Sequence, residues 1–131
     1  MESIKRQKKD RRRRAAYNIT NAQYIIWSKA LDVSNQISCK ISNRKNVFSE
    51  KFLDYLQSMK GEIRSVQKQQ YKINKHNSIK IIIAKLEQYF NRIFNVYLDQ
   101  KYSNNEILSL VRLEVTEMHR YCYRMKNSHF T

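Results

Sequence analysis

Proline is absent from this 131-residue sequence and glycine occurs once, so the residues that usually form tight turns and hairpins are almost missing. Leu, Ile, Lys, Gln and Glu fill long stretches without interruption, which is typical of helical proteins. A chain of this length is expected to form one folded domain. The composition therefore predicts an all-α fold.

Cysteine and long apolar runs are also scarce. The two cysteines, Cys39 and Cys122, lie far apart without CxxC spacing, so they supply neither a zinc motif nor a disulfide framework, and both are expected to be small core residues. No apolar run approaches the roughly 18 residues of a membrane span, and the N-terminus lacks the apolar region of a signal peptide. We expect the protein to act in a cytoplasm or inside a particle assembled there.

Acidic residues are few, 11 against 26 Lys and Arg, and the resulting charge of +15 favours a polyanionic partner, with nucleic acid as the first candidate. The excess is densest in "KRQKKDRRRR", residues 5–14. Four adjacent arginines repel one another unless an anion is present. The predicted phosphate contacts are Lys5, Arg6, Lys8, Lys9, Arg11, Arg12, Arg13 and Arg14, with Arg44 and Lys45 of a basic loop at residues 42–46 as additional candidates.

Beyond this basic arm, apolar residues recur every three or four positions. The periodicity predicts helices over roughly residues 17–41, 48–73, 79–97 and 106–126, separated by clusters of turn formers. Asn77 or Ser78 is a candidate N-cap for the third helix, and "SNNE" at residues 103–106 matches a capping box for the fourth.

Short connections between these segments favour an antiparallel four-helix bundle preceded by a basic, partly helical N-terminal arm. The arm comprises residues 1–16 and the bundle residues 17–131. Ala15 and Ala16 favour helix, so the arm is expected to continue towards the bundle as a hinged extension, with Tyr17 and Asn18 as the candidate hinge.

Two surface features of the predicted bundle concern its partners. Tyr24, Trp27 and Leu31 have helical spacing and predict a subunit interface, the alternative being that the two aromatic residues stack on bases. The charge outside the arm is expected to be spread thinly over the bundle, including a basic face at every fourth position of the second helix. That face consists of Lys60, Arg64, Lys68 and Lys72.

Residue patterns that carry catalysis are missing. The chain contains no glycine-rich phosphate loop, no GxSxG and no HExxH. The acid pairs Glu50/Asp54 and Glu114/Glu117 have the spacing of an ordinary helix surface, and His119 lies near Cys122 on a seam expected to face inward. We therefore expect no enzyme, no catalytic residue, no cofactor and no metal site.

The basic segment "KRQKKDRRRR", followed by four apolar seams in a Gly- and Pro-poor chain rich in Ile, Lys, Asn and Tyr, resembles the major coat proteins of filamentous archaeal viruses of the lipothrixvirus type. The resemblance is one of architecture and composition. It implies two related coat proteins that pair, or one that assembles with itself, N-terminal helices that wrap double-stranded DNA in an A-like form, and a lipid envelope outside the filament. It further implies that the arm cations clamp phosphates, that Tyr24 and Trp27 pack between subunits, and that the protein is found in the virion and, during assembly, in the host cytoplasm.

Three other interpretations remain open. In the first, the arm folds as a helix in a distorted RNA groove, as in arginine-rich-motif regulators, while the bundle oligomerises. In the second, the chain is a ribosome-associated or chromatin-like basic protein. In the third, the arm is a targeting signal on a basic helical domain.

Overall fold

The computed structural model describes the backbone of residues 2–42 and 50–128, and the side chains of these ranges apart from those of residues 2–12, Ala15 and Glu50. Within these ranges the chain forms helices and no strand. None of these helices is long and apolar enough to cross a membrane. The helices are α1 (Glu2–Ser42), α2 (Glu50–Asn74), α3 (Asn77–Leu98) and α4 (Asn104–Ser128).

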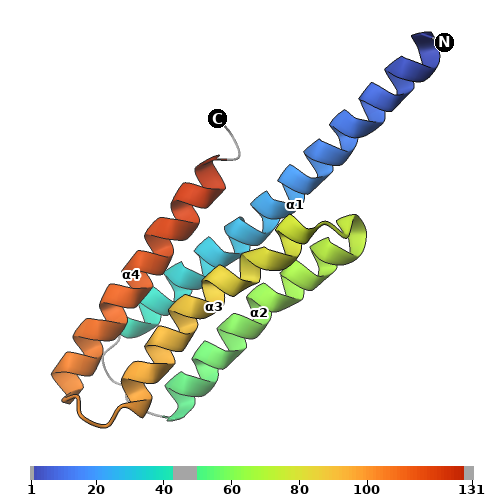
Figure 1. The fold of residues 1–131 in the computed structure, drawn as a ribbon. Coiled ribbons are helices and arrows are strands. Elements are labelled where there is room, and N and C mark those ends of the chain that lie inside the picture. Colours follow the sequence, from blue (N-terminus) through green and yellow to red (C-terminus); the bar gives the residue numbers. More distant parts are fainter. Residues whose placement is uncertain (1, 43–49, 129–131) are drawn as a thin grey trace.

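Consecutive helices run in opposite directions, so the fold is an up-down-up-down bundle (Figure 1). Each helix packs on its neighbours in sequence, α4 closes the bundle against α1, and α1 also touches α3 across the middle. Only residues 75–76 join α2 to α3, and residues 99–103 join α3 to α4. The prediction of an all-α antiparallel four-helix bundle is confirmed.

Local capping explains why α2, α3 and α4 end and begin where they do. After α2, Lys75 has a left-handed backbone (φ 44°) and its amide donates to the Tyr71 carbonyl at 2.7 Å. The His76 side chain then caps α3 by accepting from the Ser78 amide at 3.2 Å, so the cap lies one residue before the predicted Asn77. The Ser103–Glu106 capping box is confirmed, with reciprocal bonds of 3.3 and 3.4 Å.

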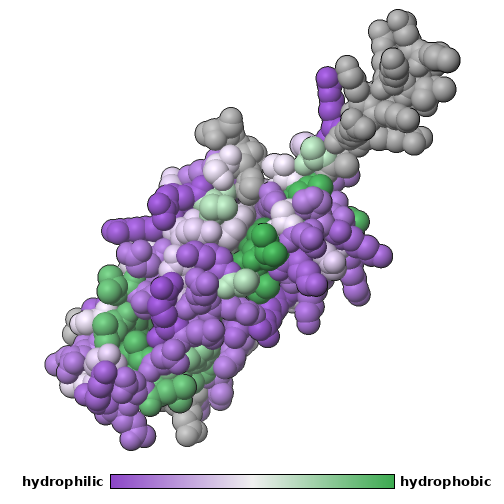
Figure 2. All heavy atoms as spheres, viewed as in Figure 1, coloured by the Kyte–Doolittle hydropathy of each residue, from purple (hydrophilic) through white to green (hydrophobic). Residues whose placement is uncertain are grey.

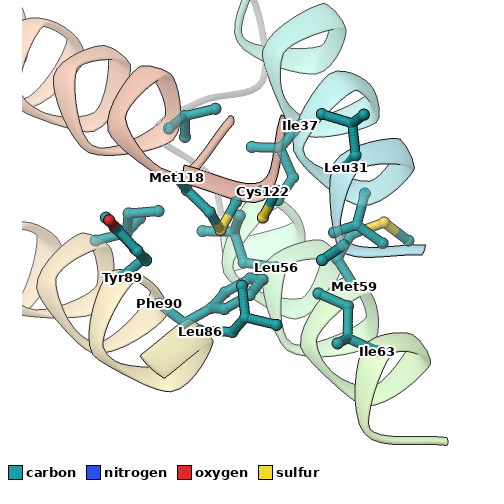
Figure 3. Close-up of a cluster of buried hydrophobic side chains, with 14 of the residues drawn as sticks. Leu31, Ile37, Leu56, Met59, Ile63, Leu86, Tyr89, Phe90, Met118 and Cys122 are labelled. Carbon is teal, nitrogen blue, oxygen red and sulfur yellow. The ribbon is translucent and has the colours of Figure 1, made fainter. Parts of the chain in front are cut away.

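All four helices contribute to one hydrophobic core, which occupies the bundle interior (Figure 3). The predicted seams of α1, α3 and α4 are buried over most of their length, from Ala22 to Ile41, from Ile79 to Ile93 and from Val111 to Cys122. Burial of these apolar side chains supplies most of the stability of such a helix bundle.

The seam of α2 departs from the prediction in its last two turns. Ile73 was expected in the core but is 74% exposed. Gln67 is buried instead, and its side-chain amide donates to the Ile79 carbonyl at 3.4 Å. This hydrogen bond lets a polar residue occupy a core position beside the first turn of α3.

Helix α1 is much longer than its partners, with 41 residues against 22 to 25. At 1.5 Å per residue it extends for about 60 Å, and its N-terminal part projects beyond the bundle (Figure 1). The helix passes through Tyr17 and Asn18 without a break, so the hinge expected there is wrong. No Pro or Gly lies between Glu2 and Ser42 to interrupt the hydrogen-bond ladder.

Candidate nucleic-acid interface

The predicted basic arm is the projecting part of α1. The first fully buried side chain of this helix is Ala22, and Arg13, Arg14 and Tyr17 before it are exposed. The helical backbone carries all eight arm cations, since residues 5–14 belong to α1. Arg44 and Lys45, the additional candidates, lie outside the described residues.

The termini of the helices define two halves of the bundle body, residues 17–128. Because the helices alternate in direction, the first half of α1 and α3 lies beside the second half of α2 and α4 (Figure 1). We divide each helix at its midpoint, counting α1 from Tyr17. The arm-proximal half then comprises residues 17–29, 62–87 and 117–128, and the distal half comprises residues 30–42, 50–61 and 88–116.

The charge of the bundle is concentrated in the arm-proximal half. This half has ten Lys and Arg and three Glu, a formal charge of +7, whereas the described residues of the distal half have six cations and six acids and are neutral. Arg44 and Lys45, which lie outside the described residues, belong to neither count. Among the described residues, the charge outside the arm is therefore gathered at one end and not spread thinly over the bundle, as was expected. The sequence segments each have a small excess, and the antiparallel topology places these excesses at the end from which the arm projects.

Ion pairs neutralise two of the three acids in the arm-proximal half. Lys29 Nζ lies 3.0 Å from Glu62 Oε2, and the Arg64 guanidinium pairs with the Glu87 carboxylate. The charge of Arg64 is thus balanced by Glu87 within the molecule, and the predicted basic face of α2 is interrupted at that position. The cations of this half that are exposed and form no ion pair with a described residue are Lys68, Lys72, Lys75, Lys80, Arg120 and Arg124.

Tyr24, Trp27 and Leu31, the predicted subunit interface, face the rest of this chain. Trp27 is 2% exposed and meets the ring of Tyr121 edge-on, with centroids 5.5 Å apart, and Leu31 is buried in the core. Tyr24 is half-buried beneath the Lys126 ammonium, which lies 5.6 Å from its ring centroid. The interface assignment is corrected for Trp27 and Leu31, because a helix with two adjacent neighbours and a diagonal one needs a wide apolar face.

The two cysteines differ. Cys122 is fully buried as predicted, and burial raises the pKa of its thiol to about 12. At neutral pH this cysteine is therefore protonated and does not act as a thiolate nucleophile. Cys39 is exposed, so the prediction that it is a core residue is wrong. It lies two residues from both Ile37 and Ile41, on the opposite side of the helix from that seam.

The acidic side chains of the described residues are set among cations and form no metal-binding group. Glu114 pairs with Arg92 at 3.2 Å and thus behaves as surface charge. No group of three His, Cys, Asp or Glu side chains in the described part of the chain could hold a metal ion. What this part of the molecule offers chemically is a cluster of exposed cations at one end.

Sequence reasoning missed four members of this cluster: Lys75, Lys80, Arg120 and Arg124. In the sequence they are single cations on two helices and a turn, and only the order and direction of the helices bring them to one end. Comparisons with protein families, with curated proteins and with solved structures found no match for this chain.

Proposed function

We propose that this chain is a structural nucleic-acid-binding protein that packages double-stranded DNA through sequence-independent phosphate contacts. In this proposal it acts as the major coat proteins of filamentous archaeal viruses do, in a helical filament built from this chain alone or with a second related coat protein. A lipid envelope outside the filament, and residence in the virion after assembly in the host cytoplasm, belong to the same proposal.

The observation that carries the proposal is the projecting basic helix. Residues 5–14 carry eight cations and one acid on a helix that extends past the bundle. A segment this rich in Lys and Arg binds a polyanion favourably, because each phosphate that it neutralises releases a condensed counterion. An arm held clear of the core also leaves room for a polymer beside it.

Sequence independence is supported by the kind of side chains available. Lys and Arg in a continuous run position a protein on phosphates, whereas base reading requires a defined set of polar side chains placed in a groove. The helical form of the arm also suits the alternative, an arginine-rich regulator that inserts a helix into an RNA groove. The two functions differ in their preference for a particular sequence.

The test is a binding titration of the full chain with fluorescently labelled random duplex DNA at several salt concentrations. If all eight arm cations contact phosphates, the slope of log K against log salt should be about −7, and affinity should fall about 10⁴-fold between 50 and 200 mM salt. Duplexes of different sequence should bind equally. A single RNA hairpin bound far more tightly than any DNA duplex would refute packaging and support the RNA-binding alternative.

Two further measurements address the arm and the filament. Removing residues 2–14 should remove most of the affinity for DNA while the far-ultraviolet circular dichroism per residue of the bundle is retained, since the first of the described side chains to be buried is Ala22. Electron micrographs of the protein with long DNA should show regular filaments. Only small discrete complexes would contradict the coat function, and an affinity for DNA that the truncation leaves unchanged would contradict the role of the arm.

A further inference from the structure

We propose that the arm-proximal half of the bundle is a second phosphate-binding surface, so that duplex nucleic acid lies against both the arm and this end. The distal half then faces away from the polymer. This inference rests on the proposed function and extends it, because it assigns contacts to residues outside the arm. Its members are the exposed cations Lys68, Lys72, Lys75, Lys80, Arg120 and Arg124.

The first support is the charge difference between the two halves. Among the described residues, a formal charge of +7 in the arm-proximal half and zero in the distal half creates a field that is strongest where the arm leaves the bundle. The helices of the bundle are about 33 to 38 Å long, so the centre of the distal half lies more than one Debye length, about 10 Å at 0.1 M salt, from that end. A bound polyanion therefore interacts with the arm-proximal cations far more than with the distal ones.

The second support is that helix electrostatics explain only some of these cations. Arg124 near the end of α4 and Lys72 near the end of α2 are favoured by the negative end of the helix dipole. Lys80 lies close to the positive end of α3, whose first turn has no acidic residue to balance it. Helix stability alone would favour an acidic residue at this position. A cation there is consistent with an anion that binds from outside the chain.

The third support is the backbone of Lys75. Its φ of 44° lies in the left-handed region, where glycine or asparagine is favoured and a side chain with a Cβ costs roughly 1 kcal/mol. Lys75 is exposed and forms no ion pair with a described residue. A cation is thus kept in the α2–α3 turn at the expense of stability, which is characteristic of functional positions.

The shape of the α4 side is also suited to a polymer. A surface depression of about 530 Å³ lies along α4, and its lining includes Arg120 and Arg124 as well as the acid Glu117, so that two cations outnumber one carboxylate there. Tyr123, 54% exposed, lines the same depression and can pack on a sugar or a base. Figure 2 shows that most of the bundle surface on the side in view is hydrophilic, as expected for a surface that meets phosphate and water.

The test compares two full-length variants that each lose four exposed cations. The proximal variant carries Lys72→Gln, Lys80→Gln, Arg120→Gln and Arg124→Gln, and the distal variant carries Lys40→Gln, Lys51→Gln, Lys101→Gln and Arg112→Gln. Glutamine keeps helix propensity, so both variants should fold, which circular dichroism verifies. The two proteins have the same net charge and differ in the half of the bundle from which the charge was removed; the distal variant also loses the ion pair of Lys101 with Asp99.

Binding to random duplex DNA is then measured as a function of salt. If two to four of the substituted cations contact phosphates, the proximal variant should show a slope shallower by about two to four. Each contact contributes about 0.9 to the slope. If the two proteins bind equally at 1 M salt, the affinity of the proximal variant at 0.1 M salt should therefore be between about 60-fold and about 4,000-fold weaker than that of the wild type. The distal variant should change the slope by less than about one.

Equal losses in the two variants, or no loss in the proximal one, would overturn the inference while leaving the arm and the proposed function in place. A wild-type protein that shows no steep salt dependence would instead overturn the proposed function itself. These two failures are therefore distinguishable in a single set of titrations.

A second measurement on the unmodified protein does not depend on the variants folding. Lysines are acetylated with and without bound duplex DNA, and the extent of reaction at each is read by mass spectrometry. Lys72, Lys75 and Lys80 should be protected several-fold, whereas Lys51 and Lys101 should react equally in both samples. Uniform protection, or protection of neither group, would contradict the assignment.

Discussion

Replacing Lys75 with glycine should stabilise the fold and weaken nucleic-acid binding. Lys75 adopts a left-handed conformation between α2 and α3, with its amide bonded to the Tyr71 carbonyl. Relieving the Cβ clash recovers roughly 1 to 2 kcal/mol, from which the greater freedom of glycine in the unfolded chain removes roughly 0.5 to 1 kcal/mol. The net gain should be about 0.5 to 1 kcal/mol, or a rise in melting temperature of about 2 to 5 °C for a chain of this size.

Lys75→Ala is the matched control, since it removes the same charge and keeps the Cβ. Thermal and urea unfolding followed by circular dichroism should place Lys75→Gly above both the wild type and Lys75→Ala in stability. Both variants should lose the same increment of salt slope, up to about 0.9, if Lys75 contacts a phosphate. A glycine variant no more stable than the alanine variant would refute the view that this backbone position is strained.

Three further substitutions test the capping, the core and the pH dependence. Ser103→Ala should lower the free energy of unfolding by about 1 kcal/mol in urea titrations, because it breaks the capping box with Glu106; an unchanged midpoint would contradict this. Tyr97→Phe should leave the protein equally stable or more stable by up to about 1 kcal/mol, because the buried Tyr97 hydroxyl has no hydrogen-bond partner among the described residues; a loss of stability would indicate a partner for it. Burial raises the pKa of the Cys122 thiol to about 12. The contribution of this thiol to stability is therefore complete below its ordinary pKa of 9.0 and is lost as the pH rises towards 12. The free energy of unfolding, measured across this pH range, should decline less steeply in Cys122→Ala than in the wild type.

The fold could be predicted from the sequence because the helix signals agree with one another. The apolar period, the clusters of turn formers and the Ser103–Glu106 box all indicate the same boundaries. Where single positions were wrong, tertiary contacts decided the outcome. Ile73 continues the period of α2 but is exposed, and Gln67 is accepted into the core because the Ile79 carbonyl accepts a hydrogen bond from its side chain.

The candidate site was only partly predictable. The arm is one continuous segment, so its charge is visible in the sequence without any knowledge of the fold. The basic end of the bundle is assembled from Lys72, Lys80 and Arg124, which belong to three helices. Each of the three segments has only a small excess of charge, so the net charge of consecutive residues does not reveal the cluster. Trp27 was misassigned for a related reason, since a wide apolar face on one helix indicates either a second subunit or a third helix of the same chain.

The continuity of α1 has a mechanical consequence. Successive residues of a helix are rotated by about 100°, so the direction in which Arg13 and Arg14 point is locked to that of Ala22 in the core. A regular polymer that binds the arm in one orientation would thereby also fix the rotation of the bundle about the axis of α1. Copies spaced along such a polymer would acquire a common orientation from it before they touch one another.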